Sequence, residues 1–252
     1  MDSVVRETGM RAPRHGGVYV VAHRGAHEGI PENTISAYRK AIELGCDFVE
    51  VDVRATKDGV LVSMHNATVD AYTQDATGTV RDFTLAELKA LDIGSRVGPE
   101  WREERVPTME EVFTLCRGKI GVYLDVKEPA VIPALLELVR KHSMEREALW
   151  YTGVPQQKQV QEACAECLLM PDPGPEKNLE PMFEKFERVP RIVASVMKYC
   201  SKEFVEFAHA RGAIVITDEG SRDDWEQMIA WGMDGIQTDH PADLIAFLDR
   251  SR

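Results

Sequence analysis

Strand-like and helix-like segments alternate along most of this 252-residue chain. Short apolar runs are followed by stretches whose apolar residues recur every three or four positions. Such alternation favours parallel strands connected by helices. Eight strand–helix units in a chain of this length predict an α/β fold, a single (β/α)8 or TIM barrel. An open, doubly wound sheet is the alternative.

The predicted barrel occupies residues 18–252, after a polar N-terminal leader at 1–17. The strands are predicted at 18–22, 48–53, 121–127, 149–152, 168–170, 192–196, 213–217 and 235–238. The helices are predicted at 33–44, from 107 onward, and at 131–142, 155–166, 176–187, 201–211, 221–231 and 241–250. A polar, irregular insertion at about 66–106 follows a hairpin on the second strand, and a loop of this length is often functional. Asn33 is the expected cap of the first helix, and Thr84 and Thr108 begin capping boxes.

The formal charge of −12 argues against nucleic acid or an anionic membrane as the main partner. It leaves a phosphate ligand possible, because a bound cation can invert the local field. We find no membrane-spanning run and no signal peptide, so a cytoplasmic location is expected, with a trimmed leader left open. The five scattered cysteines predict reduced thiols, and the pair Cys164 and Cys167 is expected to be two helical thiols.

The strand at 48–53 carries two acidic residues in an apolar setting. Three valines alternate with Phe48, Glu50 and Asp52, so both carboxylates lie on one strand face, roughly 6.6–7 Å apart along the backbone. Buried carboxylates repel each other and lose hydration, so a protonated partner, a basic side chain or a metal ion must compensate them. The alternative is an edge strand with both carboxylates in water.

A hairpin is expected to bring a histidine to this pair. Asp58 and Gly59 form a strong two-residue turn signal between strand-like runs. With these two residues at the centre of the turn, Asp52 is opposite His65, and opposed residues have Cβ atoms about 4.5–5.5 Å apart. A shift of one residue in the register would separate them.

Other polar residues follow the first and third predicted strands, where barrel enzymes carry their sites. His23 and Arg24 end the first strand, and Asp125 and Lys127 end the third. Three carboxylates without a nearby cysteine predict a site for Mg²⁺ or Ca²⁺. Arg24 and Lys127 are then available for an anion that bridges to the metal. The alternatives are a hydrogen-bonded core histidine at His23 and a salt bridge from Lys127 to Glu50.

These residues resemble the glycerophosphodiester phosphodiesterase family, and the matching motifs span positions 23 to 241 in the family's order. Several motifs lie near the predicted site, and others lie in the insertion and in the last strand. They are His23-Arg-Gly, Glu32-Asn-Thr, the stretch 45–53, Thr56-Lys-Asp-Gly, His65, the stretch 78–85, Pro107-Thr108, Asp125-Val-Lys127 and the stretch 232–241.

The resemblance implies a barrel that hydrolyses a glycerophosphodiester to glycerol 3-phosphate and an alcohol. It implies one divalent metal ion held by Glu50, Asp52 and Asp125. It also implies that His23 and His65 are the general acid and base, and that Arg24 and Lys127 hold the phosphate.

The chain departs from the family pattern at four places. Asn66 and Asp125 stand where the family usually has Asp and Glu, and Ala71-Tyr72 replaces an arginine–threonine pair. The seventh-strand motif, usually with Trp and Asn, reads Ile-Thr-Asp-Glu at 216–219. The last two departures concern the released alcohol more than the reaction.

Two other functions stay open: a related lysophospholipid or sphingolipid phosphodiesterase, and a barrel that binds a phosphate metabolite without turnover. The sequence leaves open the oligomeric state, the released alcohol and the choice between Mg²⁺ and Ca²⁺.

Overall fold

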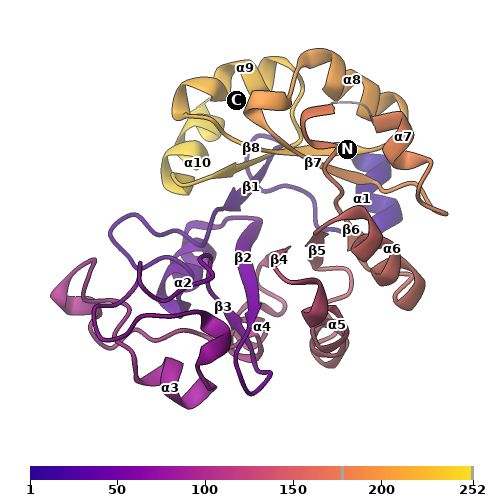
Figure 1. The fold of residues 1–252 in the computed structure, drawn as a ribbon. Helices are drawn as coiled ribbons and strands as arrows, with labels where there is room; N and C mark the ends of the chain where they lie inside the picture. Colours follow the sequence, from indigo (N-terminus) through magenta and orange to yellow (C-terminus); the bar gives the residue numbers. More distant parts are fainter. Residues whose placement is uncertain (177–178, 251–252) are drawn as a thin grey trace.

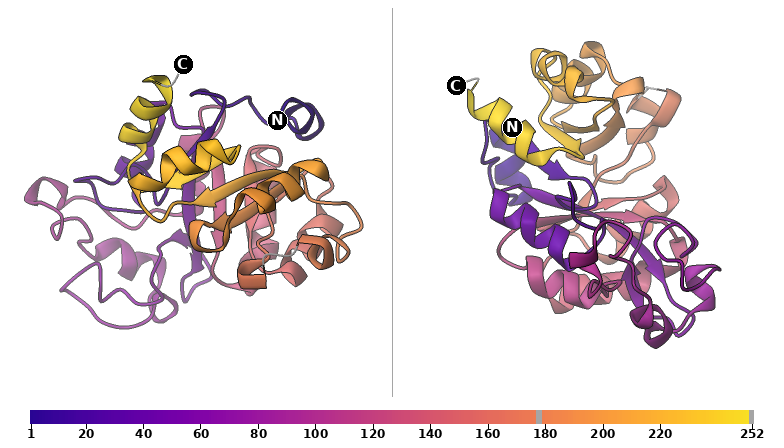
Figure 2. Two further views of the ribbon diagram at one scale, coloured as in Figure 1. Left: turned by 90° about the horizontal axis from the view of Figure 1, so that it is seen from above. Right: turned by 90° about the vertical axis from the view of Figure 1, so that its left-hand side faces the viewer.

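The strands form one sheet that is rolled into a nearly closed barrel. The computed structural model of the protein describes residues 1–176 and 179–250. The parallel strands lie in the order β6-β5-β4-β2-β1-β9-β8-β7, and β3 pairs with β2 off this path. Between the edge strands, the Ala194 N–H donates to the Pro171 carbonyl at 2.9 Å. The predicted (β/α)8 barrel is confirmed, and the helices lie outside it (Figures 1 and 2).

Each of the eight predicted strands is present, and β3 is the return strand of the hairpin. The strands are β1 (Tyr19–Ala22), β2 (Phe48–Ala55), β3 (Leu61–Ser63), β4 (Gly121–Val126), β5 (Ala148–Tyr151), β6 (Leu168–Leu169), β7 (Ile192–Val196), β8 (Ile214–Asp218) and β9 (Gly235–Thr238).

Each predicted helix is present, and the N-terminal leader contains one helix that was not predicted. The helices are α1 (Asp2–Thr8), α2 (Ile35–Leu44), α3 (Leu85–Ala90), α4 (Met109–Cys116), α5 (Ile132–Lys141), α6 (Val154–Ala163), α7 (Leu179–Phe183), α8 (Lys202–Ala210), α9 (Trp225–Ala230) and α10 (Pro241–Arg250). Positions 177–178 of the predicted helix at 176–187, and positions 251–252 of the predicted domain, lie outside the described residues.

The inner face of the strands changes from apolar to polar along their length. Tyr19 and Val21 of β1, Tyr123 of β4 and Leu149 of β5 belong to the buried cluster inside the barrel. Because side chains alternate along a strand, the next inward positions lie at the carboxyl ends. On β1 that position is His23, so polar residues begin where the apolar core ends.

The N-terminal leader packs against the barrel. It contains α1, and the buried side chains of Val4 and Met10 join the cluster inside the barrel. In Figures 1 and 2, α1 and the insertion that contains α3 lie at opposite ends of the molecule. The leader therefore adds apolar packing at the end away from the insertion.

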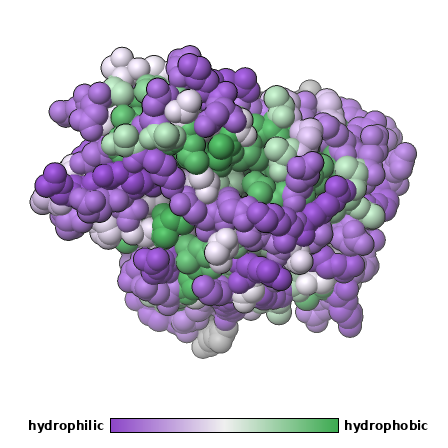
Figure 3. Space-filling view, turned by 90° about the horizontal axis from the view of Figure 1, so that it is seen from below, coloured by the Kyte–Doolittle hydropathy of each residue, from purple (hydrophilic) through white to green (hydrophobic). Residues whose placement is uncertain are grey.

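The insertion has a small core of its own. Val69, Tyr72, Val80 and Leu88 pack with residues of β3 and the segment after it. Both expected capping boxes are present, since the Thr84 and Thr108 hydroxyls accept helix N–H bonds. On the face shown in Figure 3, polar residues cover most of the surface and apolar residues show in smaller areas between them. Within the described residues, no helix is both long enough and apolar enough to cross a bilayer.

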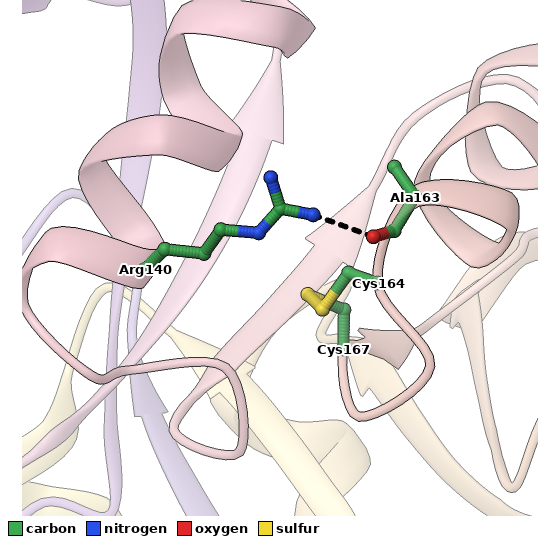
Figure 4. Close-up of a disulfide and its surroundings, with 4 residues drawn as sticks. All are labelled: Arg140, Ala163, Cys164 and Cys167. Atoms are coloured by element: carbon green, nitrogen blue, oxygen red, sulfur yellow. Dashed lines mark hydrogen bonds between the residues drawn. A yellow bond between two sulfur atoms is a disulfide. The ribbon is translucent and has the colours of Figure 1, made fainter.

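The prediction for Cys164 and Cys167 is wrong. The two residues form a disulfide, and they lie after the last residue of α6 rather than inside a helix (Figure 4). The same turn is tied to α5, because Arg140 donates from Nη2 to the Ala163 carbonyl at 2.5 Å. The other three cysteines are buried free thiols, as expected.

Candidate active site

The hairpin register differs from the prediction by one residue. Val53 pairs with Ser63, and Asp52 accepts a backbone hydrogen bond from Met64 at 3.0 Å, so Asp52 is not opposite His65. The cause lies in the turn. The Thr56 N–H donates to the Val60 carbonyl at 3.0 Å, which encloses a loop of three residues rather than two.

His65 nevertheless reaches the mouth of the barrel. Arg54 donates to the Met64 carbonyl at 3.1 Å and to the His65 carbonyl at 2.6 Å, which fixes the chain just beyond β3. The His65 ring lowers the pKa of Asp125, although burial raises the pKa of that carboxyl overall, so the two groups interact electrostatically. His65 Nδ1 lies 2.9 Å from Asn66 Oδ1. The neutral amide at position 66 therefore does orient the ring.

Glu50, Asp52 and Asp125 form one cluster. Their carboxylate oxygens lie within 4.8 Å of one another, and Asp52 and Asp125 are partners in the parallel register of β2 and β4. Glu50 is 2% exposed and Asp52 is 0% exposed. Burial, and then the charges of Asp52 and Asp125, raise the pKa of Glu50 well above its usual value. The alternative of two carboxylates in water is excluded.

The two basic residues contact this cluster. Lys127 Nζ lies 2.8 Å from Asp52 and 2.5 Å from Asp125, so the alternative of a salt bridge to Glu50 is wrong. Burial opposes the charged form of Lys127, but the two carboxylates raise its pKa. Arg24 donates its backbone N–H to Glu50 at 2.8 Å, and its guanidinium lies 3.2 Å from Glu32.

Asn33 was predicted to cap α2, but that prediction is wrong. Thr34 is the cap, and Asn33 is 2% exposed in the left-handed region at φ 55°. Its amide donates to Asp52 Oδ2 at 2.8 Å, and its Oδ1 accepts from Tyr38 and Ser63, both at 2.8 Å. Asn33 thus fixes the orientation of the Asp52 carboxylate. Its unusual φ is the kind of backbone conformation that clusters at functional sites.

Sequence reasoning also missed the partner of the predicted imidazole of His23, and it missed His27 altogether. His23 Nδ1 lies 2.7 Å from Asp239 Oδ1, and His27 Nε2 lies 3.0 Å from the same oxygen. These hydrogen bonds lower the pKa of Asp239. Asp239 was part of a matched motif but had no predicted role. Because β9 pairs with β1, only the tertiary structure brings residues 23 and 239 together.

The insertion contributes one further link to the site. The Tyr72 hydroxyl accepts the Asn66 N–H and donates to Glu32, both at 3.1 Å. It therefore connects the His65 segment with the partner of Arg24. Position 72 is one of the departures from the family pattern, which gave no signal for this role.

The acidic cluster fits a hard divalent cation. All of its donors are carboxylate oxygens, as Mg²⁺ and Ca²⁺ prefer. Among the described residues, Glu50 has no Lys or Arg side chain within 4.0 Å. Lys127 neutralises part of the charge of Asp52 and Asp125, so Glu50 is the carboxylate of the cluster with the least neutralisation by a basic side chain. Lys127 shows that a positive charge is accommodated between Asp52 and Asp125.

Comparison with known proteins bears on the same residues. The model of the glycerophosphoryl diester phosphodiesterase family matches residues 23–164, a range that contains all seven predicted site residues. The chain belongs to this family. A glycerophosphodiester phosphodiesterase of Caldanaerobacter subterraneus subsp. tengcongensis is 32% identical over 90% of this chain and 96% of its own. The expected family and enzyme class are confirmed.

Solved structures of similar proteins support the fold. A glycerophosphodiester phosphodiesterase of Agrobacterium tumefaciens is 26% identical with a TM-score of 0.77, covering 91% of this chain and 99% of that one. A phosphodiesterase of Oleispira antarctica, solved with its product sn-glycerol-3-phosphate, has a TM-score of 0.81 at 23% identity, covering 92% and 96%. As a glycerophosphoryl diester phosphodiesterase family member, this chain is a hydrolase, and the acidic cluster at its barrel mouth is its candidate metal site.

Proposed function

We propose that the protein hydrolyses glycerophosphodiesters to glycerol 3-phosphate and an alcohol, with a divalent metal ion and two histidines. The observation that carries the proposal is the buried carboxylate cluster of Glu50, Asp52 and Asp125, with both predicted imidazoles at the same barrel mouth. Family membership makes a diester the natural substrate. The product named for the Oleispira protein, sn-glycerol-3-phosphate, supports the glycerol half of it.

Glu50, Asp52 and Asp125 would hold the metal ion. When bound, a divalent cation neutralises phosphate charge and makes the phosphorus easier to attack. Lys127 and Arg24 would then contact the phosphate oxygens. Both residues lie beside the cluster, and both stay charged at neutral pH because the neighbouring carboxylates outweigh the burial that lowers their pKa values. Charged donors of this kind bind phosphate strongly.

His23 and His65 would transfer the protons. An ionised carboxylate only accepts hydrogen bonds, so Asp239 places the proton of His23 on Nδ1 and leaves Nε2 free for exchange. His65 faces Asn66 Oδ1 through its own Nδ1, which likewise leaves Nε2 for the substrate. Histidine suits both tasks because it titrates near neutral pH.

The proposed reaction has two displacements. One histidine removes the proton of the glycerol hydroxyl next to the ester, and that oxygen attacks phosphorus. The bond to the leaving alcohol breaks while the other histidine protonates the alcohol oxygen. Water then opens the resulting cyclic phosphate with the proton transfers reversed, which yields glycerol 3-phosphate.

A turnover screen tests the proposal directly. Glycerophosphodiesters with different alcohols are incubated with Mg²⁺, with Ca²⁺ or with excess chelator, and release of glycerol 3-phosphate is measured. We expect release with a metal and none with chelator. A diester that lacks the adjacent hydroxyl should be cleaved poorly, and rapid cleavage of it would contradict the two-step scheme. Metal-independent turnover, or binding without turnover, would contradict the proposal as a whole.

A further inference from the structure

The mouth of the barrel has a second acidic wall, which the proposed reaction does not use. It lies on β5, β8 and β9 and on the segment after β6, and it consists of Tyr151, Asp172, Asp218 and Gln237. Tyr151 is the register partner of Asp125, so this wall begins next to the proposed metal cluster. We call these four residues the distal wall.

All four side chains belong to the inner face of the barrel. Asp218 lies two positions after the buried inner residue Ile216, and Gln237 is the register partner of the inner residue Val21. Asp218 and Gln237 are themselves partners across β8 and β9. Tyr151 donates its hydroxyl to Asp172 at 3.2 Å. The distal wall therefore faces the same interior space as the carboxylate cluster.

The two carboxylates of the distal wall form no salt bridge within the described residues. Among residues 1–176 and 179–250, no Lys, Arg or His nitrogen lies within 4.0 Å of Asp172 or Asp218. Burial raises the pKa of each carboxyl above its usual value, and for Asp218 it outweighs the nearby His23 ring, which lowers that pKa. The charges of both residues also raise the pKa of the Tyr151 hydroxyl, after the larger effect of its burial, so both carboxylates lie on the Tyr151 side of the barrel mouth.

Gln237 supplies an independent sign of a missing ligand. Its side chain is buried, with 7% of the residue exposed, and it lies close enough to Asp218 to lower the pKa of that carboxyl. Its Oε1 has no hydrogen-bond partner among the described residues. A buried acceptor left without a donor is costly and rare, which points to a donor supplied from outside the chain.

We infer that the distal wall binds the ammonium group of the leaving alcohol, so that the preferred substrate is a glycerophosphodiester of a primary amino alcohol such as ethanolamine. This inference rests on the proposed function. Two unpaired carboxylates attract a cation, and the free Oε1 of Gln237 accepts one of its N–H bonds. A primary ammonium has three N–H donors for these three acceptors, whereas a quaternary ammonium has none.

A second metal ion fits this wall less well. Within the described part of the chain, the groups of acidic and histidine side chains that are compact enough to hold an ion include neither Asp172 nor Asp218. The aromatic rings of Tyr123 and Tyr151, whose centroids are 5.5 Å apart, border the same space. Aromatic rings beside separated carboxylates match an organic cation, because the ring faces attract it as well.

The test compares two diesters that differ only in the terminal group of the alcohol. Glycerophosphoethanolamine and glycerophospho-n-propanol have the same number of heavy atoms in the alcohol, with an ammonium or a methyl group at its end. We expect kcat/KM of the wild type to favour the ethanolamine ester by roughly 10- to 100-fold, the range for hydrogen bonds between charged groups. Asp218→Asn and Asp172→Asn should each reduce this ratio by about tenfold, and Gln237→Leu by less.

The control is Asp223→Asn, which removes one charge from an exposed position just beyond β8 and should leave the ratio unchanged. Because both rates are measured on the same preparation, a partly unfolded variant still gives a valid ratio. A wild-type ratio near one, or an unchanged ratio in Asp218→Asn, would overturn the inference while the proposed function stands. If neither diester is hydrolysed, the proposed function fails, and calorimetric affinities of the same two diesters decide the ammonium site.

Discussion

On the wall of the barrel mouth formed by β1, β2 and β4, Asp52 and Asp125 form salt bridges with Lys127, whereas the carboxylates of the distal wall form no salt bridge within the described residues. On the first wall, Lys127 contacts Asp52 and Asp125, and Arg24 contacts Glu32. On the second wall, Asp172 and Asp218 contact hydroxyl, amide and backbone groups. Under the two proposals, the first wall would hold the metal ion and the phosphate, and the distal wall would hold the ammonium group of the alcohol.

The largest effect on activity is expected from the loss of a carboxylate in the cluster of Glu50, Asp52 and Asp125. In Asp52→Ala the cluster loses its most buried carboxylate, so we expect metal-dependent turnover to fall by about 10³-fold or more, since metal stabilisation is worth several kcal/mol. Release of glycerol 3-phosphate measures it, and circular dichroism checks the fold. The isosteric Asp52→Asn serves as the second variant. Full activity in either variant would show that this wall does not hold the metal.

Substitution of His23 and of His65 tests whether both histidines transfer protons in the reaction. His23→Ala and His65→Ala should each lower kcat by roughly 10²–10⁴-fold, the usual contribution of a general acid or base. The wild type should show a bell-shaped pH–rate profile, and each variant should lose one limb. His15→Ala is the control, because His15 pairs with Asp249 away from the mouth. Near-normal turnover in His65→Ala would refute its role.

Removal of the Lys127 ammonium group, which lies between Asp52 and Asp125, tests whether the first wall contacts the phosphate rather than the alcohol. Lys127→Met should lower kcat/KM by about 10- to 100-fold, because a charged hydrogen bond contributes about 1.5–3 kcal/mol. The effect should be equal for the ethanolamine and propanol esters, since Lys127 would contact the phosphate and not the alcohol. Lys57→Met, at an exposed position of the hairpin, is the control. A loss confined to one ester would place Lys127 on the alcohol side.

The smallest effect is expected in the pH dependence of stability without metal. Burial raises the pKa of Asp218, so the folded state holds this proton more tightly than the unfolded chain does. Its stabilising contribution is fully present below the unfolded pKa, about 3.9, and is lost as pH rises through the folded pKa. Asp218→Asn should therefore show a shallower fall in Tm from about pH 4 to neutral pH.

Thermal melts in chelator measure this slope, with Asp223→Asn as the charge-matched control. A steeper fall of Tm with pH in Asp218→Asn than in the wild type would show that a basic side chain of the protein stabilises the ionised Asp218. The same melts with added ethanolamine should show a rise in Tm for the wild type, because a ligand that binds only the folded state stabilises it.

The sequence by itself determined the barrel and most of one wall. Apolar periodicity is a local property, so the alternation of strands and helices could be read directly. Side-chain alternation then placed Glu50 and Asp52 on one face of β2. The carboxyl ends of neighbouring parallel strands meet at one edge, which brought Asp125 to them, as the register of β2 and β4 shows.

Only the tertiary structure decided the partners of these residues. The hairpin register depended on a backbone bond across three turn residues, which separated Asp52 from the position opposite His65. Asn33 does not cap α2, because its side-chain amide donates a hydrogen bond to the buried carboxylate of Asp52. Asp218 and Gln237 face the mouth together because β8 pairs with β9. The pairing of β9 with β1 brings together residues more than 200 positions apart. Contacts between distant strands have no local signal, so the charge balance of each wall is a property of the folded chain alone.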